Sequence, residues 1–275
     1  MSEGSSAADA DEEKRWTTRL EAVVSPAVIA AQLAAQSAGG GAPADDTVPF
    51  RPVHRPPIGV LVVADDGSAD GEVIRFRQDS YVIGRTDGDV RIPHDGMMSA
   101  RHARLSRETD RGRARWFLTD LESRNGTFVR VNAAALQHGS VVLFGSRRYR
   151  FRDAPPPAAD PGGDGAATVG FRAVNPTDLF PSVVEVRPDG SEGPPFLLQE
   201  DAVTVGRDPK RCALVLDDPM VSPVHARLSR DAKGVWQVEN QGALNGTWVK
   251  ITRVPVGRGV QFLLGEQRFH FRVGG

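Results

Sequence analysis

The hexapeptide HARLSR occupies residues 102–107 and recurs unchanged at residues 225–230. HARLSR recurs after 123 residues, and three further matches surround it in the same order with separations of 120 to 122 residues. Changes in loop length produce such small differences. The three matches are Gly84-Arg85 with Gly206-Arg207, Asn125-Gly126-Thr127 with Asn245-Gly246-Thr247, and LFGSRRYRFR (143–152) with LLGEQRFHFR (263–272). The sequence therefore predicts a duplicated domain.

Each copy consists of short segments that alternate partly between apolar and polar residues and are rich in β-branched and aromatic side chains. Examples are YVIGR, RARWFLTDL, TFVRV and SVVLFG in the first copy, and AVTVGR, VWQVEN, TWVKI and VQFLLG in the second. Short strands separated by frequent turns, with no helical pattern between them, are typical of a β-sandwich or barrel. We expect an all-β fold with two domains, at residues 58–153 and 182–275.

The segments outside the two copies have a different character. Residues 1–57 predict a tail with two short helices, one capped by Asp11 and one opened by Ser25-Pro26, followed by a linker. Residues 154–181 are rich in proline, glycine and small residues, which predicts a flexible spacer between the domains.

Composition narrows the class of protein. The net charge of −1 indicates no overall attraction to nucleic acid or to an anionic membrane, and no apolar run is long enough to span a bilayer. The single cysteine, Cys212, excludes an internal disulfide and a cysteine-rich zinc site. The acidic N-terminus is unlike a secretory signal. We expect a soluble, cytoplasmic protein without a metal or cofactor.

The polar residues that recur are Gly-Arg, Ser-x-x-His and Asn-Gly-Thr. Each motif also has an ordinary structural explanation: a solvated charge at a strand end, a half-buried imidazole, or a tight turn. Their joint recurrence at loop positions favours a shared site, because loops at one end of a sandwich lie close together. An arginine fork, a hydroxyl and an amide suit a phosphate. No nucleophile, general base or enzyme motif accompanies them, so we expect a protein that holds an anion without transforming it.

With these motifs, in this order and twice over, the sequence resembles the forkhead-associated (FHA) family, whose members are phosphothreonine-reading β-sandwiches of the SMAD/FHA type. The resemblance covers about two-thirds of the chain, residues 58–153 and 182–274. It implies a non-catalytic adaptor that binds Thr-phosphorylated proteins, which would be substrates of a Ser/Thr kinase.

For the first copy, the resemblance implies that Arg85 and Ser99 contact the phosphate and that Asn125 binds the main chain of the ligand. Ala100 and Arg124 occupy positions that often assist. It implies structural roles for Gly84, His102 and Gly126, with the histidine bracing the phosphate-binding loop.

For the second copy, the same resemblance assigns binding roles to Arg207, Ser222 and Asn245, and supporting roles to Gly206, His225 and Gly246. The second copy also departs from the first: Ala243 replaces Ser123, Leu244 replaces Arg124, and Pro223 removes a backbone donor after the serine. With fewer donors, we expect this copy to bind phosphopeptide more weakly or to serve as a scaffold.

Two alternatives compete with this interpretation. The arginine-dense stretch RHARLSRETDRGRAR (101–115) could bind nucleic acid, although a solvated pair of strands joined by a turn explains it adequately. Both domains could instead serve only in assembly. A further hypothesis is that Thr17, Thr18 or Thr47 of the tail is phosphorylated and captured by a domain of the same or another chain.

Overall fold

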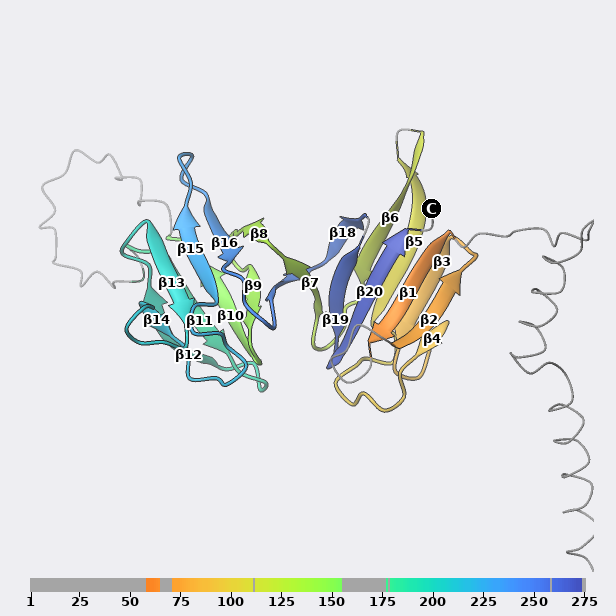
Figure 1. Ribbon diagram of the computed structural model, residues 1–275, viewed down its shortest axis with the longest axis horizontal. Helices are drawn as coiled ribbons and strands as arrows, with labels where there is room; N and C mark the ends of the chain where they lie inside the picture. The colour runs from red at the N-terminus through yellow and green to blue at the C-terminus, as the bar shows by residue number, and fades with distance from the viewer. Residues whose placement is uncertain are drawn as a thin grey trace, which may run out of the picture. The chain divides into compact units, whose positions relative to one another are not determined.

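The computed structural model describes residues 58–64, 71–110, 112–154, 177, 179–257 and 259–273. The elements within these residues are strands, β1 to β20, so the predicted all-β fold is confirmed (Figure 1). The two helices expected in residues 1–57 and most of the expected linker at 154–181 lie outside the described residues. Among the described residues, no helix has the length and apolarity needed to cross a membrane.

The strands form two β-sandwiches, which we call A and B. In sandwich A, a five-stranded sheet with the order β18-β6-β5-β3-β4 lies over the β7-β19-β20-β1-β2 part of a ten-stranded sheet. Its strands from the first half of the chain are β1 (Gly59–Ala64), β2 (Gly71–Phe76), β3 (Ser80–Gly84), β4 (Val90–Arg91), β5 (Ala103–Asp110), β6 (Arg113–Asp120) and β7 (Thr127–Val131).

Sandwich B repeats this plan. A sheet with the order β14-β13-β15-β16-β8 lies over the remaining β12-β11-β10-β9-β17 part of the ten-stranded sheet. Its strands are β8 (Ala133–Ala135), β9 (Val141–Phe144), β10 (Arg147–Arg152), β11 (Ser182–Val186), β12 (Glu192–Leu197), β13 (Ala202–Gly206), β14 (Leu214–Val215), β15 (Ala226–Arg230), β16 (Trp236–Asn240) and β17 (Thr247–Ile251).

The last three strands of each half have changed places. Strands β8, β9 and β10 follow the first half in sequence but complete sandwich B, whereas β18 (Arg253–Val256), β19 (Val260–Leu264) and β20 (Gln267–Val273) complete sandwich A. The sandwiches therefore do not coincide with the contiguous ranges 58–153 and 182–275 expected from the repeat. The segment 154–181, expected to separate two domains, instead lies between β10 and β11, which are neighbours in one sheet.

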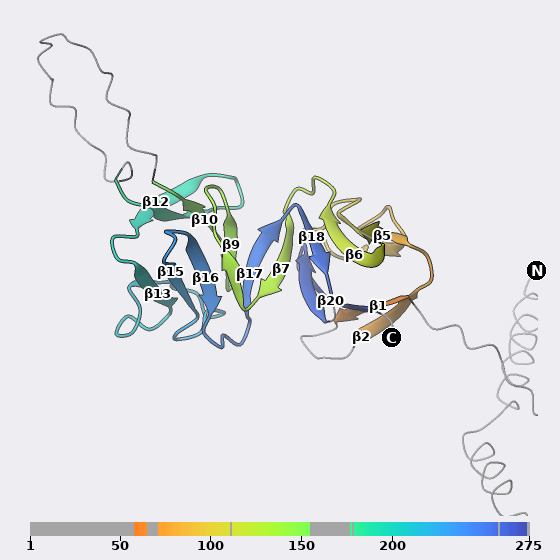
Figure 2. The same cartoon turned by 90° about the horizontal axis from the view of Figure 1, so that it is seen from above.

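The chain crosses between the sandwiches directly after β7 and β17. These two strands pair antiparallel along their whole length, from Thr127↔Ile251 to Thr247↔Val131, and so make the ten-stranded sheet continuous (Figure 2). The backbone N–H of Asp120 donates to the carbonyl oxygen of Thr252 (2.8 Å), which ties β6 of the first half to the crossing of the second.

The hydrophobic cores explain why the exchange is compatible with the sequence. In β20, Phe269 and Phe271 point inward between polar residues, and Phe271 meets Trp116 edge to face at 5.1 Å. In β10, Tyr149 and Phe151 occupy the corresponding positions, and Phe151 packs near Trp236 in core B. Because the two hairpins have the same pattern of buried aromatic residues, the exchange leaves aromatic side chains in both cores.

The arginine-dense stretch 101–115 lies mainly in an antiparallel pair. Strands β5 and β6 pair from Ala103↔Asp120 to Asp110↔Arg113, as expected for two solvated strands joined by a turn.

Candidate functional site

The recurring Gly-Arg motif lies where β3 ends. A Cβ atom on Gly84 would be 2.0 Å from the carbonyl oxygen of Ala100, so only glycine allows this approach of the two loops. The backbone N–H of Arg85 donates to the carbonyl oxygen of Ser99 (2.9 Å), and the carbonyl of Ala100 accepts from the N–H of Asp87 (3.0 Å). The glycine thus places Arg85 directly beside the loop that carries Ser99.

The side chain of Arg85 has unused hydrogen-bonding capacity. Its Nε is buried and has no hydrogen-bond partner among the described residues. A buried donor without a partner costs free energy, which an anionic ligand would recover. Arg85 is therefore available to bind a ligand.

His102 joins the two loops of the site from beneath. The backbone N–H of Ser99 donates to Nδ1 of the fully buried imidazole (3.1 Å), so Nε2 carries the proton and donates to the carbonyl oxygen of Gly126 (3.1 Å). Burial lowers the pKa of His102 below its ordinary value of 6.5 and keeps the ring neutral. Both ring nitrogens are therefore engaged, and the ring links Ser99 to the Asn-Gly turn.

The turn at Asn125-Gly126 forms the opposite side of the site. Gly126 has φ +82°, a conformation that favours glycine. The backbone N–H of exposed Arg124 donates to Oγ of Ser99 (3.0 Å), which leaves the hydroxyl proton of Ser99 free to donate to a ligand. The side-chain amide of Asn125 donates to the carbonyl oxygen of Met97 (2.6 Å).

A short polar network stiffens this turn. One carboxylate oxygen of Asp120 accepts hydrogen bonds from the hydroxyls of Ser123 and Thr127, both at 2.6 Å. The N–H of Gly126 in turn donates to the hydroxyl oxygen of Ser123 (3.0 Å). The turn is therefore held by side chains of its own copy.

A buried carboxylate that the sequence motifs do not include, Asp95, joins the loop of Ser99 to a turn from the other half of the chain. Oδ1 of Asp95 accepts from the N–H groups of Met97 (2.8 Å) and Met98 (3.1 Å), and Oδ2 accepts from those of Glu266 (2.8 Å) and Gln267 (3.2 Å) in the β19–β20 turn. The recurrence of an aspartate four residues before the serine in both copies could have revealed it.

Asp218 is the corresponding aspartate of the second copy. It accepts from the N–H of Met220 (2.8 Å) and from both the N–H (2.8 Å) and the hydroxyl (2.7 Å) of Ser146, in the β9–β10 turn. Burial raises the pKa of Asp218, but the hydrogen bonds from Ser146 and Met220 outweigh burial and lower the pKa below its ordinary value. Each candidate loop therefore rests on a hairpin from the other half of the chain.

The second copy repeats the bonding scheme of the first. The N–H of Arg207 donates to the carbonyl oxygen of Ser222 (3.1 Å), and the N–H of Ser222 donates to Nδ1 of His225 (3.1 Å). Nε2 of His225 lies 3.1 Å from the carbonyl oxygen of Gly246, and burial lowers the pKa of this histidine too. The amide of Asn245 donates to the carbonyl oxygen of Met220 (2.9 Å).

The supporting glycines of the second copy are equally constrained. A Cβ atom on Gly206 would lie 2.3 Å from the carbonyl oxygen of Pro223, and Gly246 has φ +75°. The turn before Gly246 differs, because Ala243 is buried and offers only its carbonyl oxygen to the N–H of Gly246 (3.1 Å). Leu244, 86% exposed, presents an apolar side chain where the first copy has Arg124.

A cavity of about 620 Å³ opens against the loops of the first copy. Four of the five binding residues expected there line it, whereas Ala100 does not. Sandwich B supplies the remaining wall, which the sequence analysis did not foresee. Its lining includes Arg85, Ser99, Arg124 and Asn125 from the first copy and Ser146, Arg147, Arg148 and Glu185 from sandwich B.

The lining of this cavity is rich in groups that can hold an anion, although the carboxylate of Glu185 also lies in it. Guanidinium groups, a hydroxyl and an amide converge on it, and they are all hydrogen-bond donors suited to phosphate oxygens. Among the described residues, no group of three or more histidine, cysteine or acidic side chains is arranged to hold a metal ion.

Comparison with known families identifies the two copies. The family model of the FHA domain matches residues 81–145 and again residues 203–265. The chain is a tandem FHA-domain protein. The two matches contain both sets of recurring motifs, so FHA domain 1 carries Arg85, Ser99 and Asn125, and FHA domain 2 carries Arg207, Ser222 and Asn245.

Solved FHA structures are similar to part of this chain. The FHA domain of the CT664 protein from Chlamydia trachomatis is 25% identical over 29% of this chain and 85% of that chain, with a TM-score of 0.19. FHA-1 of Rv1747 from Mycobacterium tuberculosis is 27% identical over 31% and 90%, with a TM-score of 0.17.

A third similar structure is larger. EmbR from Mycobacterium tuberculosis, solved in complex with a low affinity phosphopeptide, is 23% identical over 30% of this chain and 22% of that chain, with a TM-score of 0.19. No curated protein sequence matches the chain.

Proposed function

We propose that FHA domain 1 is the main reader of phosphothreonine in a cytoplasmic, non-catalytic adaptor for Ser/Thr kinase signalling. The observation that carries the proposal is Arg85, whose buried Nε has no partner among the described residues and whose side chain lines a cavity shared with Ser99. The guanidinium and the hydroxyl would bind the phosphate oxygens. The partners would be proteins phosphorylated on threonine by such a kinase.

Asn125 supplies the second half of recognition in this proposal. A phosphate alone is common to many molecules, so a reader of phosphopeptides must also bind the main chain. The amide of Asn125 is half-buried at the cavity wall, where it would orient the peptide beside the phosphate. Ser99 accepts from the N–H of Arg124, and this bond keeps the serine and the turn together as the ligand binds.

FHA domain 2 would be a weaker reader or a scaffold. It retains Arg207, Ser222 and Asn245, but Pro223 lacks a donor and exposed Leu244 contributes no charge. Two fewer donors, each worth about 1.5–3 kcal/mol with a charged acceptor, would weaken phosphate binding substantially.

The test is the binding of phosphothreonine peptides to the full chain, first with an oriented library and then by fluorescence anisotropy with a selected sequence. Replacing Arg85 with alanine should lower affinity by about 10-fold to 150-fold, the loss expected for one charge-assisted hydrogen bond. Arg207→Ala is the matched control and should change affinity far less. Binding that survives dephosphorylation of the peptide, or that is indifferent to Arg85→Ala, would refute the proposal.

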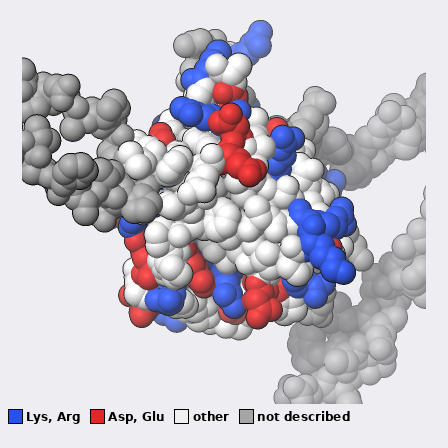
Figure 3. All heavy atoms as spheres, turned by 90° about the vertical axis from the view of Figure 1, so that its left-hand side faces the viewer, with Lys and Arg blue, Asp and Glu red and all other residues white. Residues whose placement is uncertain are grey.

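The nucleic-acid alternative has less support. Figure 3, which shows the face on the side of sandwich B, has an uncharged centre with both basic and acidic side chains around it. Arginines near the dense stretch are also paired: Arg107 with Asp79 (3.3 Å) and Arg253 with Glu108 (2.6 Å). A steep loss of affinity for generic RNA or DNA with rising salt would nevertheless favour this alternative over ours.

Self-recognition is a special case of the proposed function. A phosphorylated Thr17, Thr18 or Thr47, all outside the described residues, would be a ligand for FHA domain 1 of the same or another chain. A change in hydrodynamic radius or oligomeric state on phosphorylation, lost in the corresponding Thr→Ala variant, would support it. No change on phosphorylation would exclude it.

A further inference from the structure

We infer that the phosphopeptide site of FHA domain 1 contains a second anion subsite at Arg148, which the exchanged β9–β10 hairpin brings to the cavity. This subsite would select phosphopeptides that carry a second anionic group, either a carboxylate or another phosphate, near the phosphothreonine. The inference rests on the proposed function and deepens it.

The position of Arg148 follows from the strand exchange. Arg148 is the second residue of β10, a strand of sandwich B, yet it lines the same cavity as Arg85 and Ser99. The strands β10, β9, β17 and β7 are consecutive neighbours in the ten-stranded sheet, and β7 begins directly after the Asn125 turn. This order brings Arg148 of β10 to the cavity beside that turn. Its guanidinium lies over the ring of Phe128 in β7, 5.7 Å from the ring centre.

Arg148 directly contacts the residue that would hold the peptide main chain. One of its guanidinium nitrogens lies 3.4 Å from Oδ1 of Asn125, a long hydrogen bond to a neutral acceptor. A peptide bound between Arg85 and Asn125 therefore passes within reach of Arg148. A neighbouring anionic side chain of that peptide would meet the guanidinium there.

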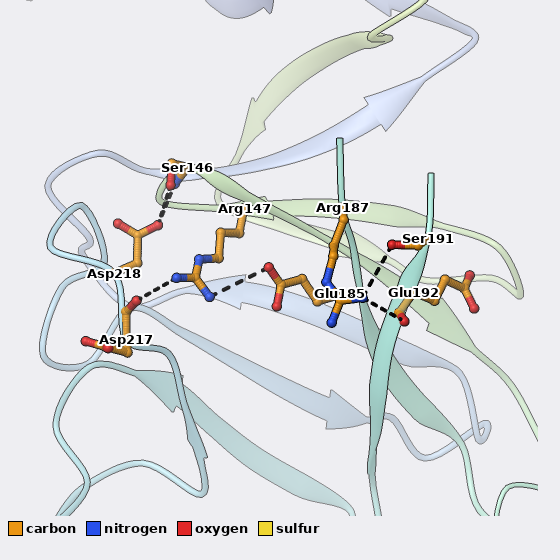
Figure 4. A network of polar contacts seen from close by, with 8 residues as sticks. All are labelled: Ser146, Arg147, Glu185, Arg187, Ser191, Glu192, Asp217 and Asp218. Atoms are coloured by element: carbon orange, nitrogen blue, oxygen red, sulfur yellow. Dashed lines mark hydrogen bonds and ion pairs between the residues drawn. The ribbon is translucent and has the colours of Figure 1, made fainter. Parts of the chain in front are cut away.

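The charge of Arg148 is available, unlike that of the preceding arginine. Arg147 forms an ion pair with Glu185 (3.6 Å) and donates to the carbonyl oxygen of Asp217 (3.1 Å), as Figure 4 shows. Arg148 has no carboxylate within ion-pair distance among the described residues. Burial around it lowers its pKa, which reflects a cation that is partly removed from water without a counter-charge.

An anion at this position would be favoured for two physical reasons. It would supply the missing counter-charge in a partly desolvated setting, where charge-assisted hydrogen bonds are strong. The planar guanidinium, held over Phe128, is also preorganised to bind a carboxylate or a phosphate through two parallel hydrogen bonds.

The second copy provides a matched control. Arg268 occupies the corresponding place in β20 and lies over the ring of Trp248 at 5.7 Å. Within the described residues, however, no hydrogen bond joins Arg268 to Asn245, whose amide donates to Met220. Replacing Arg268 therefore removes an equivalent charge and aromatic contact without touching the proposed subsite.

The experiment measures the affinity of the full chain for three matched phosphothreonine peptides by fluorescence anisotropy. The first has neutral flanking residues. The second is a series in which one aspartate is placed in turn at each position on either side of the phosphothreonine. The third carries phosphoserine at the position where aspartate gives the highest affinity. Wild type, Arg148→Gln, Arg268→Gln and Glu185→Gln are compared, with circular dichroism and thermal melting as checks of folding.

We expect wild type to prefer an acidic peptide over the neutral peptide by about 10-fold, the lower end of the range for one charge-assisted hydrogen bond. Arg148→Gln should abolish the preference, measured as the ratio of the affinities for the acidic and the neutral peptide in the same variant, whereas Arg268→Gln should retain it. Glu185→Gln should increase the preference, because it releases Arg147 from its ion pair. The aspartate and phosphoserine arms decide which anion is preferred.

Two failures can be told apart. If phosphothreonine peptides bind through Arg85 but show no acidic preference, or one that survives Arg148→Gln, the second subsite is refuted and the proposed function stands. If no peptide binds in a phosphate-dependent way, both are refuted.

Discussion

The exchange of hairpins between the sandwiches predicts which pairs of engineered cysteines form disulfides. In the structure Val62 of β1 faces His270 of β20, and Val184 of β11 faces Arg150 of β10. Without the exchange, the repeat would place Arg150 opposite Val62 and His270 opposite Val184. The pairs Val62→Cys/His270→Cys and Val184→Cys/Arg150→Cys should therefore cross-link, and the pairs Val62→Cys/Arg150→Cys and Val184→Cys/His270→Cys should not.

The strand register sets the distance between the paired residues and the length of the loop that each disulfide closes. Directly opposed residues of an antiparallel pair have Cα atoms about 4.5–5.5 Å apart, within the range that a disulfide requires. A bond between positions 62 and 270 closes a loop of about 200 residues, which should stabilise the fold by about 5 kcal/mol in the chain-entropy description. A bond between positions 150 and 184 closes a loop of about 35 residues and should contribute about 4 kcal/mol.

The assay is mild oxidation followed by non-reducing gel electrophoresis, thiol counting and urea denaturation. The buried native thiol of Cys212, whose pKa is raised by burial, stays reduced in every variant and serves as the internal reference. Cross-linking of Val62→Cys/Arg150→Cys in place of Val62→Cys/His270→Cys would refute the exchange. Disulfide-linked dimers formed by the first two pairs would show that the hairpins are exchanged between chains.

Three further predictions concern stability. Asp218→Ala removes the acceptor of three hydrogen bonds and should lower the free energy of unfolding in urea by about 3 kcal/mol, whereas the exposed neighbour Asp217→Ala should change it by less than about 0.5 kcal/mol. Because burial lowers the pKa of His102 and His225 in the folded state, the unfolded chain binds more protons below the ordinary value of 6.5. Stability should therefore fall as pH drops from about 7 to 5, and a flat urea midpoint over that interval would contradict the neutral, buried rings. Gly84→Ala forces a Cβ atom to within 2.0 Å of a backbone carbonyl oxygen, so it should lower both the melting temperature and phosphopeptide affinity; an unchanged melting temperature would show that the loops can separate.

Much of the site could be predicted because its residues lie close to recurring motifs. Gly84-Arg85, Ser99-x-x-His102 and Asn125-Gly126 occur in both copies, and the requirements behind them are local: a close backbone approach, a short loop and a positive φ. The supporting aspartates at 95 and 218 recur as well, but a single carboxylate in a loop carries no signal of the distant turn that it holds.

The strand exchange could not be predicted, for an energetic reason. LFGSRRYRFR and LLGEQRFHFR share the alternation that buries two aromatic residues, so this pattern does not distinguish one core from the other. The proline- and glycine-rich segment 154–181 resembles a spacer between domains whether it joins two sandwiches or two neighbouring strands of one. Local sequence therefore says little about which sandwich a hairpin completes.

The sequence by itself determined the β-sandwich class, the duplication and the set of polar residues in each copy, because strand alternation and turn chemistry depend on near neighbours. Only the tertiary structure decided that β7 pairs with β17, that the hairpins change places, and that Arg148 joins Arg85 in one cavity. Those outcomes depend on the difference in free energy between two packings with nearly the same contacts, and that difference arises from the whole assembly of strands.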